Sequence, residues 1–330
     1  MNRPLISICV PVYNVAPYIE RCARSLMEQS YPELEFIFVD DASTDDSLVQ
    51  LQQVLNAYPE RKNQVVLLHN DHNHGLAYTR RRTIEEAHGK YVLCVDSDDY
   101  IEADTAQRMV DEAQATGADI VAAGFVHEYA HRQEIAMPTS GEVDTDYVYL
   151  ALTDQLPHLC NKLILRSLFT EGRSCYAPEG MDYLEDRLTV FFLLTKAKHI
   201  ASLQSATYHY VHREDSVSQD KNEKHFLCLL RYWKEVDLVL SELGLSESYK
   251  AVVGKQKIED KAFLLHFCDN RTRKQFADIF AEEEKEYSPE LSRGVALMYR
   301  LSKHHLWVLT YLYERYIHCY AKLKKRSRTV

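Results

Sequence analysis

The chain has 330 residues, which is enough for one large domain or for a domain with a substantial extension. Hydrophobic residues make up 46% and aromatic residues 11% of the chain, and this composition excludes global disorder. The net charge of −10, from 39 Lys and Arg against 49 Asp and Glu, argues against a nucleic-acid-binding surface across the whole molecule.

The first 125 residues alternate between strand-like and helical patterns. Short apolar runs rich in β-branched and aromatic residues predict buried strands at 5–10, 34–39, 65–69, 91–95 and 120–125. Helical patterns separate these runs, at 18–29, 45–58, 75–87 and 104–116. Such alternation predicts an α/β domain with a mostly parallel, twisted sheet and helices on both faces.

The pattern is less regular beyond this point. A polar hairpin is predicted at 127–138, further strands at 159–165 and 206–212, and a helix at 183–196. From about Glu223 the pattern is wholly helical, with one apolar stripe over residues 226–243 and another over 306–323. We therefore predict an α/β domain over residues 1–220 and a helical C-terminal extension over residues 221–330.

The eight cysteines include no C-x-x-C pair, and Cys9 and Cys94 lie inside predicted strands. This favours reduced core thiols in a cytosolic protein over a disulfide framework or a zinc site. No charged leader precedes a long apolar stretch, and no apolar run is long enough to span a bilayer. Neither a secretory signal nor a membrane span is therefore expected.

Two acidic clusters follow predicted strands, and they are the strongest functional signal in the sequence. Asp40 and Asp41 end the second strand, whereas Asp96, Asp98 and Asp99 follow the strand at 91–95. In parallel sheets, ligands bind beyond the carboxyl ends of the strands. Carboxylates gathered there repel one another, which favours a hard divalent cation carrying a phosphorylated ligand. The alternative is that these acids cap the following helices and are otherwise solvated.

Two other side chains are expected at the same edge. Tyr13 follows the first strand, so its ring is placed to stack on a nucleobase while Asp41 accepts a base N–H. Arg80 is a charge-assisted donor for a base carbonyl or a phosphate. The alternatives are a rim tyrosine packed on the first helix and a solvated basic helix face. A polar loop is predicted for three nearby histidines whose spacing matches no metal-ligand pattern, His69, His72 and His74.

In their order and spacing these segments resemble the family 2 glycosyltransferases, which are inverting enzymes with a GT-A fold. The family pattern is P-x-Y-N, V-D-D-x-S-x-D, N-x-G-x-x-x-x-R, A-x-G-x-Y and D-x-D-D. The matching residues are 11–14, 39–45, 73–80, 87–91 and 96–99, which cover about the first third of the chain. The chain departs from the pattern at Ala42, Arg81 and Thr83, where the family usually has glycine, asparagine and glycine.

The resemblance implies a nucleotide-diphosphate-sugar donor, most often a UDP-sugar, together with Mn²⁺ or Mg²⁺. It implies that Asp98 and Asp99 contact the metal. It also implies a nucleotide site made of seven residues: Pro11, Tyr13, Asp41, Arg80, Asp96, Ser97 and Asp98. The expected acceptor is a hydroxyl of a glycan or of a lipid-linked molecule, in the synthesis of a cell-surface polysaccharide.

The second half carries weaker matches. Residues 180–186 resemble the E-D motif that opens a helix beside the acceptor. Inversion needs a base for the acceptor hydroxyl, and Asp186 is expected to be that base, with Glu185 as its neighbour and Asp182 in reserve. The alternative is an acidic helix start favoured by the helix dipole. Arg213 is expected to close over the diphosphate, and Lys162 either meets the acceptor or a phosphate, or is solvated.

A basic segment ends the chain, with Lys322, Lys324, Lys325, Arg326 and Arg328. It either contacts an anionic inner membrane leaflet or is a solvated terminus. We therefore expect a cytoplasmic protein, and peripheral contact with the cytoplasmic face of the membrane is one of the two interpretations of this segment. Three other classes are weighed: a catalytically idle nucleotide-sugar-binding protein, a receiver-type signalling domain, which needs its acidic pair after the first strand, and a sugar nucleotidyltransferase, which needs a glycine-rich loop there.

Overall fold

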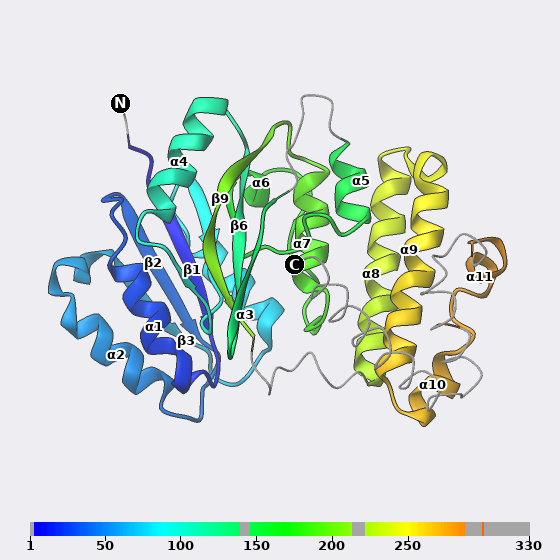
Figure 1. Ribbon diagram of the computed structural model, residues 1–330, viewed down its shortest axis with the longest axis horizontal. Coiled ribbons are helices and arrows are strands. Elements are labelled where there is room, and N and C mark those ends of the chain that lie inside the picture. The colour runs from blue at the N-terminus through cyan, green and yellow to red at the C-terminus, as the bar shows by residue number, and fades with distance from the viewer. Residues whose placement is uncertain (1–2, 139–145, 213–221, 288–298, 300–330) are drawn as a thin grey trace, which may run out of the picture. The chain divides into compact units, whose positions relative to one another are not determined.

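The computed structural model describes residues 3–138, 146–212, 222–287 and 299. The chain divides into two compact units, residues 1–214 and 215–330 (Figure 1). The predicted boundary between residues 220 and 221 falls in the stretch 213–221, which lies outside the described residues. Each unit has buried apolar side chains of its own.

The first unit alternates strands and helices, as its sequence predicts. Its elements in chain order are β1 (Ile6–Val12), α1 (Ala16–Met27), β2 (Leu34–Asp40), α2 (Ser47–Ala57), the 3-10 helix η1 (Pro59–Gln64), β3 (Val65–His69), α3 (Leu76–Glu85), β4 (Tyr91–Cys94), β5 (Tyr100–Ile101), α4 (Thr105–Thr116), β6 (Ile120–Tyr129), β7 (Arg132–Ala136), α5 (Tyr147–Leu152), β8 (Lys162–Leu165), α6 (Ser167–Thr170), α7 (Glu185–Leu194) and β9 (Ile200–Val211). The sequence analysis does not predict η1, β5, α5 or α6. The strand β5 has two residues, and the three helices have four to six residues, less than two turns of an α-helix.

All the strands of the described residues belong to one sheet, with the order β3-β2-β1-β4-β8-β6-β9-β5 and with β7 paired to β6. The strands β3, β2, β1 and β4 are parallel to one another, and β6 is parallel to β9. In contrast, β8 is antiparallel to both of its neighbours, β4 and β6. The predicted hairpin is confirmed as β6 and β7. The α/β class is also confirmed, with a sheet that is parallel on one side of β8 and mixed on the other.

Helices cover both faces of this sheet (Figure 1). Ile6, Ile8 and Val10 of β1 are fully buried in one core with side chains of α1 and α4. Cys9 points to the opposite face, where its Sγ donates to the carbonyl oxygen of Thr83 in α3 at 3.4 Å. Because successive strand residues face opposite sides, α1 and α4 lie on one face and α3 lies on the other.

The carboxyl ends of β1, β2 and β4 meet at one edge of the sheet. The register pairs Val12 with Asp40, so the residues that follow, Tyr13 and Asp41, lie at the same level. The amide of Asp41 donates to the carbonyl of Val12 at 2.8 Å. On the other side of β1, Cys9 pairs with Cys94, two residues before Asp96. The segments that the sequence assigns to a nucleotide and a metal therefore share one edge.

The second unit is helical, as predicted, with α8 (Glu223–Glu242), α9 (Ser246–Phe267), α10 (Asn270–Phe276) and α11 (Ala281–Tyr287). The first apolar stripe is buried at Phe226, Leu229, Trp233, Val236 and Leu240. Leu243 is 48% exposed, because α8 ends one residue before it. The second stripe, 306–323, lies outside the described residues. Within the part of the chain that is described, no helix has both the length and the apolar character needed to cross a membrane.

Candidate active site

The turns after β1 and β2 are bonded to each other. Asn14 Oδ1 accepts a hydrogen bond from the amide of Thr44 at 2.8 Å, and the amide of Asn14 donates to Ser43 Oγ at 3.2 Å. Tyr13 lies beside this junction, and 44% of its surface is exposed. The structure thus places Tyr13 at the rim of the strand ends, with its ring accessible to a ligand.

Ala42 in the second turn has a left-handed backbone, with a φ of 58°. A residue with a Cβ atom pays roughly 1–2 kcal/mol to adopt this conformation, whereas glycine does not. The chain therefore departs from the glycine of the family pattern in residue type but keeps the backbone conformation that glycine favours.

Asp41 anchors the loop that leads to α3. Its Oδ1 accepts from Asn70 Nδ2 at 2.6 Å and from the amide of His74 at 2.9 Å, and its Oδ2 accepts from the amide of Gly75 at 2.9 Å. Gly75 is required there, because its φ is +90° and an added Cβ would lie 2.3 Å from Asp182 Oδ1. The contact of Asp41 with a base stays a prediction, and the buried carboxylate has a structural role in addition.

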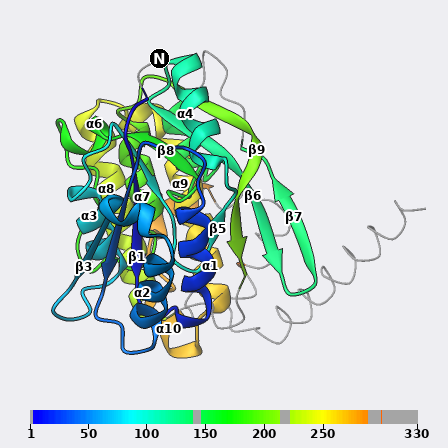
Figure 2. The same ribbon diagram turned by 90° about the vertical axis from the view of Figure 1, so that its left-hand side faces the viewer.

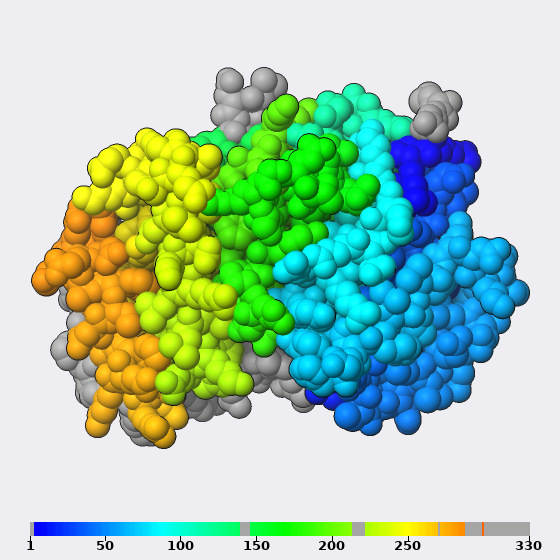
Figure 3. Space-filling model, turned by 180° about the vertical axis from the view of Figure 1, so that it is seen from behind, coloured from blue at the N-terminus to red at the C-terminus, as the bar shows by residue number. Residues whose placement is uncertain are grey.

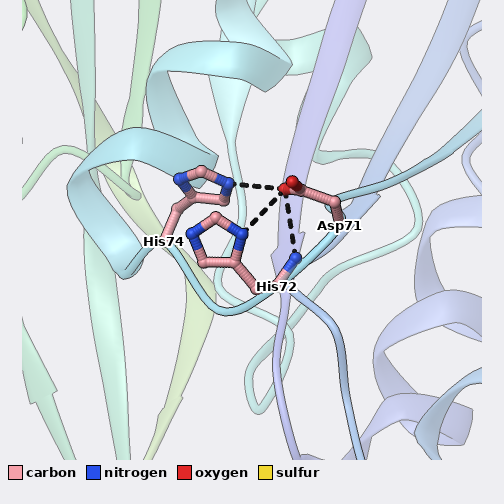
Figure 4. Close-up of side chains that lie close together, drawn as sticks. All are labelled: Asp71, His72 and His74. Atoms are coloured by element: carbon pink, nitrogen blue, oxygen red, sulfur yellow. Dashed lines mark hydrogen bonds and ion pairs between the residues drawn. The ribbon is translucent and has the colours of Figure 1, made fainter.

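Asp71, His72 and His74 gather in this loop (Figure 4). Asp71 Oδ1 lies 2.8 Å from His74 Nε2 and 3.0 Å from His72 Nδ1. The His74 hydrogen bond is the main cause that lowers the pKa of Asp71 to about 2. His69 is not part of the group, since its Nδ1 lies 3.6 Å from Asp40 Oδ2. The segment is a polar loop, as predicted, whose ligand atoms are close enough together to compete for an added metal ion.

Residues of β9 donate hydrogen bonds to the acidic segment that follows β4. Asp99 is only 2% exposed; its Oδ2 accepts from the Tyr208 hydroxyl and its Oδ1 from the amide of Val211, both at 2.8 Å. The Tyr208 oxygen in turn accepts from the amide of Asp96 at 3.1 Å. Burial, and then the charges of Asp96 and Asp98, raise the pKa of Asp99 to about 8. Asp99 lies deeper than a metal ligand should, because both of its oxygens are bonded within the protein.

The remaining acids of this segment, Asp96 and Asp98, are the candidates for binding a divalent cation. Asp98 is half-buried beside Asp96, and carboxylate oxygens are the ligands that Mg²⁺ and Mn²⁺ prefer. The raised pKa of Asp99 reports negative charges that repel one another, and a bound cation would relieve this repulsion. Of the two predicted metal ligands, Asp98 is the better placed, with Asp96 next to it.

Arg80 joins two acidic segments. Its Nη2 donates to Asp96 Oδ1 at 2.8 Å, and its Nη1 donates to Glu185 Oε1 at 2.7 Å. Arg80 is 6% exposed, since it shares the buried stripe of α3 with Ala77 and Ile84. We expected Arg80 to bond a base or a phosphate, but the structure buries its guanidinium between carboxylates. In the space-filling view, the α3 segment (cyan) and the α6–α7 segment (green) lie side by side (Figure 3).

Glu185 and Asp186 begin α7 but have opposite pKa shifts. Burial, and then the charge of Asp186, raise the pKa of Glu185 to about 7, although Arg80 opposes the shift. Burial also acts to raise the pKa of Asp186, but His158 and Arg80 outweigh it and hold this pKa below its usual value. His158 Nδ1 lies 3.8 Å from Asp186 Oδ2. Asp186 is therefore ionised at neutral pH and, with 32% of its side chain exposed, is open to a substrate.

His158 and Tyr208 are site residues for which the sequence analysis predicts no role. Tyr208 lies in a predicted strand, 206–212, and His158 lies just before another, 159–165. No motif of the sequence includes His158, so only the structure brings it to the site. Arg213 and the basic C-terminal residues lie outside the described residues, so their roles stay predictions.

Lys162 is buried, so the interpretation that it is a solvated lysine is wrong. It is 1% exposed, and its Nζ donates to Asn161 Oδ1 at 2.9 Å and to the carbonyl of His158. Burial lowers the pKa of Lys162 to about 8. A contact of Lys162 with an acceptor or a phosphate stays a prediction.

The buried Lys162 predicts a pH dependence of stability. Its pKa is lower in the folded chain than in the unfolded one, so the cost of burying its charge is present below pH 8. This cost disappears as the pH rises towards 10.5, and it corresponds to about 3 kcal/mol. We expect wild type to gain stability relative to Lys162→Met between pH 7.5 and 10, in urea unfolding. A constant difference between the two proteins would contradict this assignment.

The comparisons with known proteins agree with this geometry. The model of the family described as "Glycosyl transferase family 2" matches residues 7–172, half of the chain. The chain therefore belongs to glycosyl transferase family 2. Family membership confirms the predicted resemblance and decides against both a receiver domain and a nucleotidyltransferase.

Among curated relatives, the "Uncharacterized glycosyltransferase EpsJ" of Bacillus subtilis is 29% identical over 225 residues, which are 66% of this chain and 63% of EpsJ. Poly(ribitol-phosphate) beta-N-acetylglucosaminyltransferase TarS of Staphylococcus aureus is 29% identical over 286 residues, 85% of this chain and 47% of TarS. The chain thus spans about half to two thirds of the length of these relatives.

Solved structures share the fold. A crystal structure of residues 1–349 of S. aureus TarS in complex with UDP-GlcNAc has a TM-score of 0.62 and 21% identity, and the match covers 90% of this chain and 91% of that one. The mannosyltransferase PcManGT from Pyrobaculum calidifontis, in complex with GDP-Man and Mn²⁺, has a TM-score of 0.52 and 17% identity, covering 96% of this chain and 84% of the other. The predicted GT-A fold is confirmed.

Proposed function

We propose that this protein is an inverting glycosyltransferase that moves a sugar from a UDP-sugar to a hydroxyl of a glycan or lipid-linked acceptor, with Mn²⁺ or Mg²⁺. The observation that carries the proposal is the buried Arg80. One guanidinium binds Asp96 of the donor-side acids and Glu185 of the acceptor-side acids, so the two acidic segments converge. The TarS structures with UDP-GlcNAc and UDP support the choice of donor class.

The chemistry follows from the charges of these residues. Ionised Asp186 takes the proton of the acceptor hydroxyl while that oxygen attacks the anomeric carbon. The bond between the anomeric carbon and the diphosphate breaks, and the diphosphate leaves with the electron pair. A single displacement of this kind inverts the anomeric configuration. Asp98, with Asp96, would hold Mn²⁺ or Mg²⁺, and the ion would supply positive charge for the departing diphosphate.

The relatives also bear on the biological role. EpsJ and TarS carry glycosyltransferase names, and TarS acts on poly(ribitol phosphate) according to its name. We extend the proposal to the synthesis of a cell-surface polysaccharide, in the cytoplasm, with the basic residues 322–328 contacting the inner leaflet of the membrane. At about 1 kcal/mol per basic residue near an anionic surface, these residues would add a weak affinity.

The proposal is tested with a panel of UDP-, GDP- and dTDP-sugars plus Mn²⁺, by thermal shift and by release of free nucleotide. At 100 times its Kd, the true donor stabilises the protein by about 2.7 kcal/mol. We expect this shift in wild type with a UDP-sugar and its loss in Asp98→Asn. The exposed Asp46→Asn is the matched control and should bind like wild type.

Binding of Mn²⁺ alone is measured by titration of the variant His72→Ala/His74→Ala. These two histidines are replaced because, together with Asp71, they offer a second place for a metal ion. Two results would count against the proposal. Equal thermal shifts of Asp98→Asn and Asp46→Asn with the UDP-sugar would show that Asp98 does not bind the metal ion. Binding of a UDP-sugar with no release of UDP across a broad acceptor set would identify an idle binding protein instead.

A further inference from the structure

One face of the β6–β9 ladder carries aromatic and imidazole side chains. The parallel register pairs Phe125 with Tyr208 and His127 with Tyr210. Because strand residues alternate between faces, Tyr129 and His212 belong to this same face. Figure 2 shows β6, β7 and β9 side by side at one side of the first unit. We call Phe125, His127, Tyr129, Tyr210 and His212 the aromatic row.

The rings of the row are in contact from one end to the other. The centroids of Phe125 and His127 are 5.6 Å apart, and those of His127 and His212 are 5.3 Å apart. His127 Nδ1 and His212 Nε2 are 3.1 Å apart, within hydrogen-bond distance. Tyr129 stacks on His212 at 4.1 Å and 7°. Exposure increases along the row, from 7% at Phe125 to the exposed His212.

The inner end of the row reaches the proposed catalytic base. Phe125 lies edge-on to His158, with centroids 5.1 Å apart, and His158 Nδ1 is 3.8 Å from Asp186 Oδ2. Tyr208, which contacts Phe125 at 5.4 Å, is the residue that bonds Asp99. The row is therefore continuous with the candidate active site at both of its acidic segments.

The row has little charge of its own. Burial is the main cause that lowers the pKa of both His127 and His212, so both imidazoles are neutral at neutral pH. At the outer end Arg132 lies 4.4 Å over the Tyr129 ring, and its Nε is 3.5 Å from Glu134, which balances its charge. Such a surface suits an uncharged ligand with apolar faces and polar edges. A pyranose ring is that kind of ligand, since its faces carry C–H groups and its edge carries hydroxyls that phenols and imidazoles can bond.

We propose that the aromatic row binds successive sugar rings of an uncharged glycan acceptor and presents its terminal hydroxyl to Asp186. This inference rests on the proposed function and adds the acceptor class, a neutral saccharide chain. A polyol-phosphate acceptor, which the name of TarS gives for that protein, would instead need cations along the row.

The test uses the full chain and neutral gluco-oligosaccharides of one to four residues, with UDP and Mn²⁺ present. Binding is followed by ligand-detected NMR. The KM for the acceptor is measured in a second assay, with the UDP-sugar donor in place of UDP. In Tyr129→Ala/His212→Ala, we expect the Kd or KM for the trisaccharide and tetrasaccharide to rise about tenfold, as the loss of aromatic contacts predicts. The monosaccharide value should not change. Tyr149→Ala, an exposed tyrosine of α5, is the matched control.

Each outcome separates the row from the catalytic proposal. Hydrolysis of the UDP-sugar, in which water takes the sugar and UDP leaves, is measured without an acceptor. It should be equal in wild type and the double variant, since neither residue contacts the donor acids. Two results would overturn the proposed role of the aromatic row and leave the proposed function standing, provided that wild type still hydrolyses the UDP-sugar. In the first, all variants bind oligosaccharides equally well. In the second, wild type binds no oligosaccharide. Binding of poly(ribitol phosphate) in preference to the neutral chains would also overturn the proposed role of the row. Absence of UDP binding and release in wild type would instead overturn the proposed function.

Discussion

Replacing Asp186 with asparagine is expected to lower the rate of glycosyl transfer about 10³-fold and to leave UDP binding unchanged. The amide has nearly the shape of the carboxylate but cannot accept a proton, and general-base catalysis contributes roughly 10² to 10⁴ in rate. His158 and Arg80 keep Asp186 ionised at neutral pH, so wild type always has the base in its active form. The measurement is kcat by release of UDP in the presence of acceptor, together with a Kd for UDP and Mn²⁺.

Two neighbouring variants make this assignment specific. Asp182→Asn removes the reserve carboxylate, which is exposed and packs against Gly75. Glu185→Gln removes the acid that is bound to Arg80. If Asp186→Asn keeps most of the wild-type kcat while Asp182→Asn or Glu185→Gln loses it, the base is the residue replaced in the inactive variant.

Replacing Arg80 with methionine is expected to destabilise the first unit by about 3–5 kcal/mol. Methionine keeps much of the apolar volume but leaves the carboxylates of Glu185 and Asp96 without their shared partner. Removing one member of a buried ion pair costs this much because a buried charge is left uncompensated. For a domain of this size the melting temperature should fall by roughly 10 °C. Urea unfolding and thermal melts measure the effect.

The next residue along α3 provides the control. Arg81 is exposed and pairs with Glu85 at the helix surface, so Arg81→Met should cost less than about 1 kcal/mol. Arg80→Met/Glu185→Gln should recover part of the loss, because one of the stranded charges is then absent. Equal destabilisation by Arg80→Met and Arg81→Met would show that the pairing of Arg80 contributes nothing to the fold.

The pattern of the sequence was sufficient for much of the fold. Buried strands such as β1 and β2 are apolar on both faces, and the helices between them have a clear period. Their places along the chain and their parallel direction could therefore be predicted. The place of β8 in the sheet could not be predicted. A strand of four residues carries no signal for its neighbours or its direction, and β8 lies antiparallel between β4 and β6.

The candidate site divides in the same way. The positions of Tyr13, Asp41 and Asp98 at one edge follow from strand ends in a parallel sheet. The ion pair of Arg80 with Glu185 joins residues 105 positions apart, and no local pattern predicts which helix faces which. The aromatic row is an intermediate case. Its alternation is visible in the sequence, but the register that brings β6 and β9 together is not.

A crystal structure of the protein with UDP and Mn²⁺ would show whether the ends of β1, β2 and β4 form one nucleotide site. We predict density for uracil between Tyr13 and the turn at Asp41, with the diphosphate and the metal ion beside Asp98. A nucleotide bound away from these strand ends, or a metal ion with no contact to Asp98, would contradict the account.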